Sequence, residues 1–468
     1  MDEAKIKNFP LAEYAAEYWV DHARFEDVSS YIQDGMDLLF DEDKLHFTIW
    51  LWVYNMDDYS SYRDNTRPKK PDAVPLYYAA LCGFRGLVER LLTAHLENLN
   101  AEGGLYGAPL NAALDKGHLD IALFLLDRGA DGQNRGLMDQ TGLYIASSRG
   151  YADVVRSLID RGADLNAICK DNDEGGDEMK WTPLQVAIYT DRRDIAVLLL
   201  DRGADTEILL SSLNQTALYM ASSRGWADVV RSLIDRGADL NAICEDYDEG
   251  TFDVKWTPLQ VAIDKERRDT TVLLLERGAD TETRNCRNET ALHMASSGKC
   301  ADIVRQLISY GADLNAECNG IDEYDNDVKW TPLHVARTPP IARTLLEHGA
   351  DPNAPDDLGN TALHLASRRD WGEVVTFVEL VLEYGANVDA RDKKGWTPLH
   401  GAAYHLNLEV VVVSLNRGAD PCAQTNKGET PIQLANAPYL MQEEDQAQII
   451  RLLSLCTSER MWGLGSWD

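Results

Sequence analysis

Apolar residues recur with a helical period through most of the chain, and residues 216–242 show the pattern within one unit. Thr216 is placed to cap a first helix, which Gly225 ends. Apolar residues within 229–234 then recur at i, i+1, i+4 and i+5, which predicts one buried face on a second helix that ends at Gly237. Two such short helices cannot bury their apolar faces alone, so the unit must stack on neighbours of its own kind.

The same pattern returns about every 33 residues. Each unit opens with Thr-Pro-Leu-His or a close variant, and Gly-Ala-Asp or Gly-Ala-Asn follows about 20 residues later. The motif begins at Thr141, Thr182, Thr216, Thr257, Thr290, Thr331, Thr361, Thr397 and Thr430, and weaker copies begin at Pro75 and Ala108. This signature resembles the ankyrin repeat. The resemblance covers residues 75–457 and implies an all-α solenoid of about eleven helix-turn-helix repeats with β-hairpin loops.

A longer period shows that the duplicated element is a pair of repeats. Thr141 and Thr216 are 75 residues apart, and Thr216 and Thr290 are 74 apart. Residues 143–169 and 218–244 differ at only two aligned positions, Ile145/Met220 and Tyr151/Trp226. The copies therefore look recently duplicated.

Three repeats carry an acidic insertion of about eight residues before the motif threonine. We call these segments finger 1 (170–180), finger 2 (245–255) and finger 3 (319–329). Each is expected to form a hairpin whose turn has moved outwards, to Gly175-Gly176, Gly250 and Gly320 respectively. Their acidic residues are Asp171, Asp173, Glu174, Asp177 and Glu178; Glu245, Asp246, Asp248, Glu249 and Asp253; and Asp322, Glu323, Asp325 and Asp327.

Three interpretations of the fingers are open. They are solvated loops that add solubility, or anionic tips that hold a basic partner, or a calcium site. The calcium interpretation is weakened because Asp171 and Asp173 lack the later bidentate glutamate of an EF-hand loop.

The resemblance also implies where a partner lies, because ankyrin arrays usually bind across their first helices and hairpin tips. The positions that carry over are Ser148, Arg149, Tyr189, Thr190, Ser223, Arg224, Asp264 and Lys265. Trp181, Trp256, Trp330 and Trp396 precede the motif threonine. Hairpin packing is favoured for these indoles, and exposed binding anchors are the alternative.

The charge balance narrows the choice of partner. The 468 residues hold 45 Lys and Arg against 77 Asp and Glu, a net charge of −32. Nucleic acid and anionic membrane are therefore not expected as partners. The expected partner is a protein or peptide, and a basic one is a candidate. Eight cysteines without a CxxC pair, an acidic N-terminus and no apolar run of about 18 residues predict a cytoplasmic chain with reduced cysteines. A monomer is expected.

The ends of the chain depart from the repeat. Residues 1–54 are expected to form a helical cap, 55–74 a linker and 458–468 a C-terminal tail. Residues 9–19 and 75–84 are similar to the segment that precedes the ankyrin array in fungal NACHT-ankyrin proteins. That resemblance implies a sensing arm, but the chain has no GxxxxGK[ST] loop, so no ATPase activity follows.

The sequence offers no catalytic, cofactor or metal site. His293, His334, His364 and His400 occupy the motif position whose ring hydrogen-bonds backbone between repeats, and Cys169, Cys244 and Cys318 recur with the pair period as buried residues. No GxSxG, HExxH or GxGxxG motif is present. We therefore expect a non-enzymatic protein-binding scaffold. The alternative is a regulatory arm of a separate NACHT-type NTPase, and an enzyme site within the first 70 residues is the least favoured hypothesis.

Overall fold

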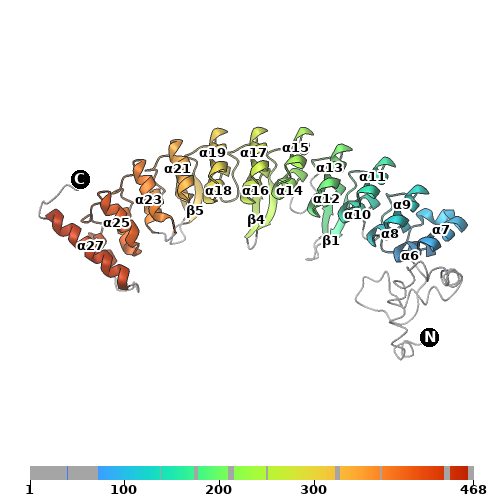
Figure 1. Cartoon of the computed structure of the whole chain (residues 1–468), viewed down its shortest axis with the longest axis horizontal. Coiled ribbons are helices and arrows are strands. Elements are labelled where there is room, and N and C mark those ends of the chain that lie inside the picture. Colours follow the sequence, from blue (N-terminus) through green and yellow to red (C-terminus); the bar gives the residue numbers. More distant parts are fainter. Residues whose placement is uncertain are drawn as a thin grey trace, which may run out of the picture. The chain divides into compact units, whose positions relative to one another are not determined.

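The computed structural model describes residue 40 and residues 72–137, 139–172, 178–208, 215–248, 251–321, 327–368, 372–436 and 443–461. Its α-helices follow one another in pairs (Figure 1). They fall into two compact units: unit 1 comprises residues 1–220 with 235–238, and unit 2 comprises 221–234 with 239–468. The predicted helices of residues 1–54 lie outside the described residues. Phe40 is the exception, and its buried ring packs edge to face on Phe84.

Both units are built from helix pairs, and unit 2 departs most in length, with four residues in α20 and nineteen in α27. Unit 1 contains α6 (Pro75–Cys82) and α7 (Arg85–Ala94), the 3-10 helix η1 (Leu96–Asn100), α8 (Pro109–Asp115) and α9 (Leu119–Asp127), α10 (Gly142–Arg149) and α11 (Ala152–Asp160), and α12 (Pro183–Tyr189) and α13 (Arg193–Asp201). The division between the units runs through α14 (Ala217–Arg224) and α15 (Ala227–Asp235). Unit 2 contains α16 (Pro258–Asp264) and α17 (Arg268–Glu276), α18 (Ala291–Ser297) and α19 (Ala301–Ser309), α20 (Pro332–Val335) and α21 (Pro339–Glu347), α22 (Ala362–Ser367) and α23 (Val374–Glu383), α24 (Pro398–Tyr404) and α25 (Leu408–Asn416), and α26 (Pro431–Ala435) and α27 (Glu443–Met461).

Within each unit, first helices pack on first helices and second helices on second helices. In unit 1, α10 contacts α8 and α12, while α11 contacts α9 and α13. The small Ala146 of α10 is fully buried and allows this close approach, and Val155 and Leu158 of α11 are buried on the inner face. The all-α stack of helix pairs predicted from the sequence is therefore confirmed.

The motif threonine caps the first helices of repeats that carry it, as predicted, whereas α6 and α8 begin after Val74 and Ala108 and have no side-chain cap. The Thr141 hydroxyl accepts a hydrogen bond from the Tyr144 amide at 3.2 Å, which satisfies one of the free N–H groups at the start of α10. In α12 the cap is reciprocal, because Thr182 accepts from the Gln185 amide and the Gln185 side chain accepts from the Thr182 amide at 3.0 Å. Proline follows at the first helical position and pre-sets its φ.

The fourth motif residue then joins one repeat to the next. Nδ1 of His293 lies 3.3 Å from the Thr290 amide, which donates to it, so the proton is on Nε2 and is donated to the Trp330 carbonyl at 3.0 Å. His364 makes the same bridge to the Trp396 carbonyl at 3.2 Å. The expected inter-repeat role of these histidines is confirmed.

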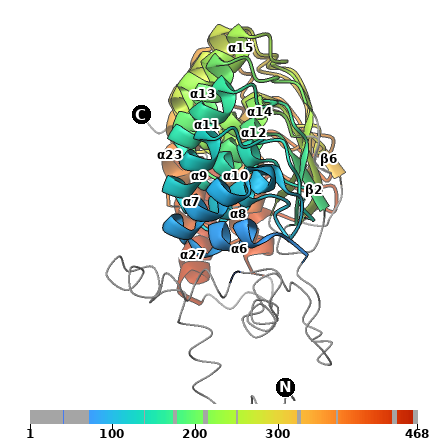
Figure 2. The same cartoon turned by 90° about the vertical axis from the view of Figure 1, so that its right-hand side faces the viewer.

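The three fingers are two-stranded antiparallel sheets. They pair β1 (Cys169–Asn172) with β2 (Glu178–Trp181), β3 (Cys244–Asp248) with β4 (Thr251–Trp256), and β5 (Cys318–Ile321) with β6 (Asp327–Trp330). Each sheet begins with a buried cysteine directly opposite the tryptophan. Seen along the stack, finger 1 lies on the side of the first helices, away from α11 and α13 (Figure 2).

One turn prediction was wrong. Gly320 is not at a turn but inside β5, paired with Val328. The other predicted turn positions, Gly175, Gly176 and Gly250, lie outside the described residues. A Cβ atom on Gly320 would lie 2.4 Å from the Trp330 ring. The glycine therefore makes room for the indole at this position of the strand.

The buried histidines give the fold a pH dependence with a defined sign. Burial penalises the imidazolium and lowers the pKa of His293 and of His364 from 6.5 to about 4, although the acceptor carbonyls oppose this. In the unfolded chain both rings take up a proton near pH 6.5, while in the folded chain they stay neutral until about pH 4. The stability they provide is therefore complete above pH 6.5 and is lost as the pH falls towards 4.

We predict that lowering the pH from about 7.5 to about 5 reduces the free energy of unfolding by about 2 kcal/mol for each of these two histidines. The double variant His293→Gln/His364→Gln should lose this dependence, because Gln185 and Gln260 make the same cap and bridge in sister repeats. Urea unfolding at several pH values measures it. Replacing the exposed His95 by Gln is the control, and equal pH slopes for the parent and the double variant would contradict the assignment.

Candidate partner-binding surface

The tryptophans at the base of fingers 1 and 2 are packing residues. Trp181 is 4% exposed and Trp256 is 8% exposed, and each lies opposite a buried cysteine. This burial favours hairpin packing, with the rings in the junction between the hairpin and its first helix, and a role in binding for Trp181 and Trp256 stays a prediction. Trp330 is only partly exposed, and a role in binding for it stays a prediction.

The acidic tips fall largely outside the described residues. Asp173, Glu174, Asp177, Glu249, Asp322, Glu323 and Asp325 lie outside them, and of Asp171, Glu178, Asp246, Asp248, Asp253 and Asp327 only the backbone is described. At the base of finger 2 the Glu245 carboxylate pairs with Lys255 at 3.4 Å. The binding role of the finger acids stays a prediction.

Tyr189 forms an exposed aromatic surface beside finger 1. Its ring stacks on Trp181 with centroids 5.0 Å apart and the planes 30° from parallel. Tyr189 itself is 57% exposed, so the buried indole holds a ring that remains open to solvent. Such a fixed ring can contact a partner with little loss of side-chain entropy.

Arg149 is fixed by the preceding repeat. Its guanidinium donates to the Asp115 carboxylate at 2.8 Å, and Lys116 lies 3.1 Å from the same carboxylate. Burial would raise the pKa of Asp115, but hydrogen bonds from Tyr106, Lys116 and Arg149 outweigh it and hold this pKa below its usual range. Arg149 therefore links its own repeat to the preceding one, and the ion pair fixes the position of its side chain.

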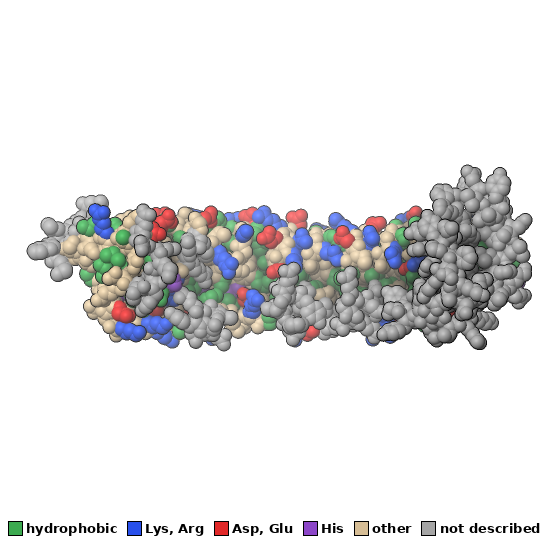
Figure 3. Space-filling model, turned by 90° about the horizontal axis from the view of Figure 1, so that it is seen from below, with side chains coloured by type: hydrophobic (Ala, Val, Ile, Leu, Met, Phe, Trp, Pro, Cys, Tyr) green, Lys and Arg blue, Asp and Glu red, His purple; other side chains and the backbone are tan. Residues whose placement is uncertain are grey.

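The remaining predicted contact residues carry both signs of charge. The Arg224 guanidinium lies over the Trp226 ring at 5.8 Å from its centroid, and Lys265 pairs with Asp264 at 3.0 Å. On the described part of the face in Figure 3, acidic and basic side chains are interspersed with apolar ones. A mixed surface of this kind suits a protein or peptide better than a small apolar ligand.

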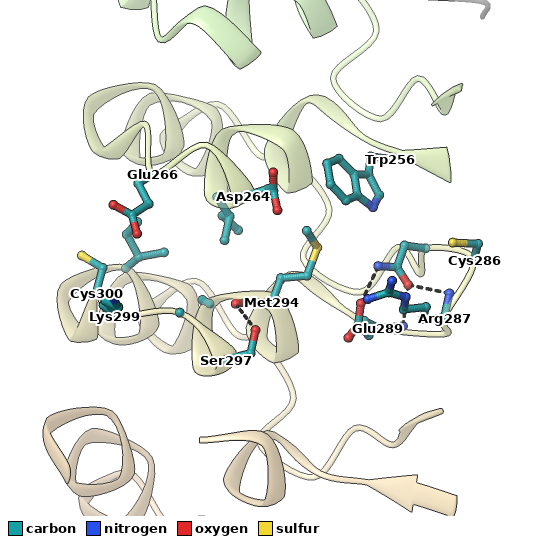
Figure 4. Close-up of a pocket in the computed structure, with 15 residues that line it drawn as sticks. Trp256, Asp264, Glu266, Cys286, Arg287, Glu289, Met294, Ser297, Lys299 and Cys300 are labelled. Atoms are coloured by element: carbon teal, nitrogen blue, oxygen red, sulfur yellow. Dashed lines mark hydrogen bonds between the residues drawn. The ribbon is translucent and has the colours of Figure 1, made fainter. Parts of the chain in front are cut away.

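Unit 2 also contains a cavity of 290 Å³ between two adjacent repeats (Figure 4). Trp256 and Asp264 border it from one repeat, and Met294, Ser297 and Cys300 border it from the next. Trp256 and Asp264 were named from the sequence, but the cavity itself was not. A signal was available, because residues 298–300 read Gly-Lys-Cys where residues 224–226 of the sister repeat read Arg-Gly-Trp.

In the part of the chain that the structure describes, no helix has the length and apolar character needed to cross a membrane. No group of three or more His, Cys, Asp or Glu side chains in those ranges is arranged to hold a metal ion. The eight cysteines are free thiols.

Comparison with known proteins finds similarity along most of the array. A family model described as ankyrin repeats (3 copies) matches residues 132–209, 206–285, 274–356 and 338–425. The azaphilone pigments biosynthesis cluster protein L of Monascus ruber is 36% identical over 141 residues, which cover 28% of this chain and 30% of that protein. The E3 ubiquitin-protein ligase KEG of Arabidopsis thaliana is 26% identical over 307 residues, which cover 62% of this chain and 18% of that protein.

The chain thus spans less than a third of the length of either relative. Among solved structures, the human ASB11 ankyrin repeat domain matches with a TM-score of 0.40 and 23% identity, over 50% of this chain and 98% of that one.

We predict that Trp181→Ala lowers the free energy of unfolding by about 3–5 kcal/mol, since it leaves a cavity under Tyr189 and beside Cys169. Tyr189→Ala should change it by less than about 1 kcal/mol, because that ring is exposed. Urea unfolding followed by circular dichroism compares the two variants. An unchanged unfolding midpoint for Trp181→Ala would show that the indole does not hold the hairpin.

Proposed function

Because the chain belongs to the ankyrin-repeat family, whose repeats are generally protein–protein interaction modules, we propose that it is a non-enzymatic scaffold that binds a basic protein partner. In this proposal the partner lies across the first helices and the hairpin tips. The chain acts as a monomer inside the cell, with its thiols reduced, and nucleic acid and membranes are not its ligands.

The observation that carries the proposal is the acidic finger repeated in three repeats. The fingers hold five, five and four acidic residues, and each stands on a two-stranded sheet whose first residue is a buried cysteine. An anchored base keeps the acidic strands outside the helical stack. Charge clustered in this way attracts a basic surface and speeds its association.

The sensing-arm alternative makes a different prediction. It depends on the NACHT resemblance of residues 9–19 and 75–84. Both segments lie outside the family-model matches, and the first also lies outside the described residues. A regulatory arm should copurify with a nucleotide-hydrolysing chain and release it or retain it according to the nucleotide. A scaffold should bind its partner equally with and without nucleotide.

We predict that changing every Asp and Glu of the three fingers to Asn or Gln abolishes capture of basic proteins from a lysate of the source cells. Parent capture should weaken between about 0.05 M and about 0.5 M salt, because screening shortens the reach of exposed charges. Mass spectrometry of the captured proteins gives the measurement.

A matched control separates the fingers from net charge. It neutralises an equal number of exposed acids elsewhere, such as Asp153, Asp194 and Asp269, and should keep the parent's partners. Retention of the same partners by the finger variant at both salt concentrations would assign the fingers to solvation and refute the proposal.

A further inference from the structure

The cavity in unit 2 lies where another part of the chain places an arginine. In unit 1, Asp115 ends α8 and receives the Arg149 guanidinium from the next repeat at 2.8 Å. Asp264 ends α16 at the matching position, seven residues after the start of its motif, as Asp115 is after Ala108. The residue that corresponds to Arg149, eight residues after the motif threonine, is Gly298.

The missing side chains explain the space. Gly298 removes the guanidinium, and Cys300 stands where the sister repeats carry Tyr151 and Trp226, the second of which is buried. The helix also ends one residue earlier, because α18 stops at Ser297 and Gly298 is extended, whereas α10 continues to Arg149. Two large side chains are therefore absent at one junction between repeats.

The Asp264 carboxylate has fewer ion-pair partners than the Asp115 carboxylate. Within the described ranges, the one ion pair of Asp264 is with its neighbour Lys265 at 3.0 Å, whereas Asp115 pairs with both Lys116 and Arg149. Glu266 also borders the cavity and forms no ion pair with any residue that the structure describes. In Figure 4 both carboxylates lie along the same side of the cavity.

The rest of the lining suits an aliphatic stem with a charged end. Trp256, Ile263 and Met294 supply apolar surface, and an indole face attracts a guanidinium. Glu289 is engaged with the Asn285 amide at 2.8 Å. The cations Arg287 and Lys299 also border the cavity, both on exposed positions of the α18 repeat, opposite the wall that carries Asp264.

We infer that this cavity binds one arginine side chain of the protein partner, whose guanidinium takes on Asp264 the place that Arg149 takes on Asp115. The inference rests on the proposed function. The volume of 290 Å³ is at the lower end of ligand pockets, about 300 Å³, which suits a single side chain. Arginine is selected over lysine because its planar fork can bond both oxygens of the Asp264 carboxylate and its flat face can stack on the nearby Trp256 ring.

The test compares two synthetic peptides of equal charge, Gly-Ser-Gly-Arg-Gly-Ser-Gly and the same peptide with Lys in place of Arg. We expect the parent chain to bind the Arg peptide at least about tenfold more tightly in a titration followed by ligand-observed NMR. Gly298→Arg should abolish the difference, because the chain then supplies its own guanidinium. Gly298 has φ −80°, which any residue adopts, and a Cβ atom would lie 3.3 Å from the Ala295 oxygen, so only a small shift is needed.

Asp264→Asn is the second variant. It should also reduce the affinity for the Arg peptide to the affinity for the Lys peptide, and it does not require the fold to accommodate a larger side chain. Asp269→Asn removes an exposed carboxylate of the same repeat outside the cavity and should bind like the parent. In a Cys286→Ser background, the Arg peptide should slow alkylation of Cys300 but not of the exposed Cys422.

Equal binding of the two peptides, or a preference for Arg that survives both Gly298→Arg and Asp264→Asn, would overturn the inference. The finger-neutralised variant should bind the Arg peptide as the parent does, so the two proposals fail separately. Loss of captured partners without any Arg preference leaves the scaffold standing and removes the pocket. If the chain prefers the Arg peptide but the finger-neutralised variant keeps its partners, the pocket stands and the role of the fingers is refuted.

Discussion

The inability of a two-helix unit to bury its own apolar face governs this structure. Each pair has one apolar side facing its neighbours, so its stability comes from the junctions between repeats. Those junctions are closed by a few recurring groups: small residues such as Ala146 where first helices meet, and the side chain at the fourth motif position. His293 and Gln185 have the same role there, each accepting from the cap threonine's amide and donating to a backbone carbonyl in the segment before the next motif threonine.

Positions that stabilise the junctions between repeats are therefore distinct from positions that can be substituted without destabilising the array. The cap, the bridge and the Cys–Trp junction must be kept in every finger-bearing pair, because each satisfies buried polar groups or fills space between repeats. The end of the first helix and the start of the second face solvent or a partner. Tyr189 and Asp264 are equivalent positions in pairs of otherwise similar sequence, and one carries an exposed ring where the other carries a carboxylate. The exposed surface therefore differs from repeat to repeat through substitutions that cost the stack little.

Most of the fold could be read from the sequence because its determinants are local. A threonine followed by proline predicts a helix start, and Gly225 has the positive φ that its position after α14 required. The exception, Gly320, shows where local reasoning stops, since glycine predicts a turn by its φ but is needed here because the Trp330 ring lies against it. The cavity escaped prediction for a similar reason. The cavity exists because two large side chains are missing from one junction. Their loss is recognised only by comparing this junction with the one where Arg149 pairs with Asp115.

Finger 2 and the cavity meet at one residue, and the two proposals taken together would let a surface of high negative charge select among basic partners. Charges at a finger attract any basic protein, and their effect fades over about 8 Å at physiological salt. Trp256 ends β4 and also borders the cavity, so the base of finger 2 is one wall of the pocket. Under the two proposals, a basic segment drawn to the finger is thereby brought next to Asp264, where an arginine side chain that fits the cavity pairs with the carboxylate. In these proposals long-range attraction sets the rate of encounter, while the gap left by Gly298 and Cys300 sets how long each complex lasts.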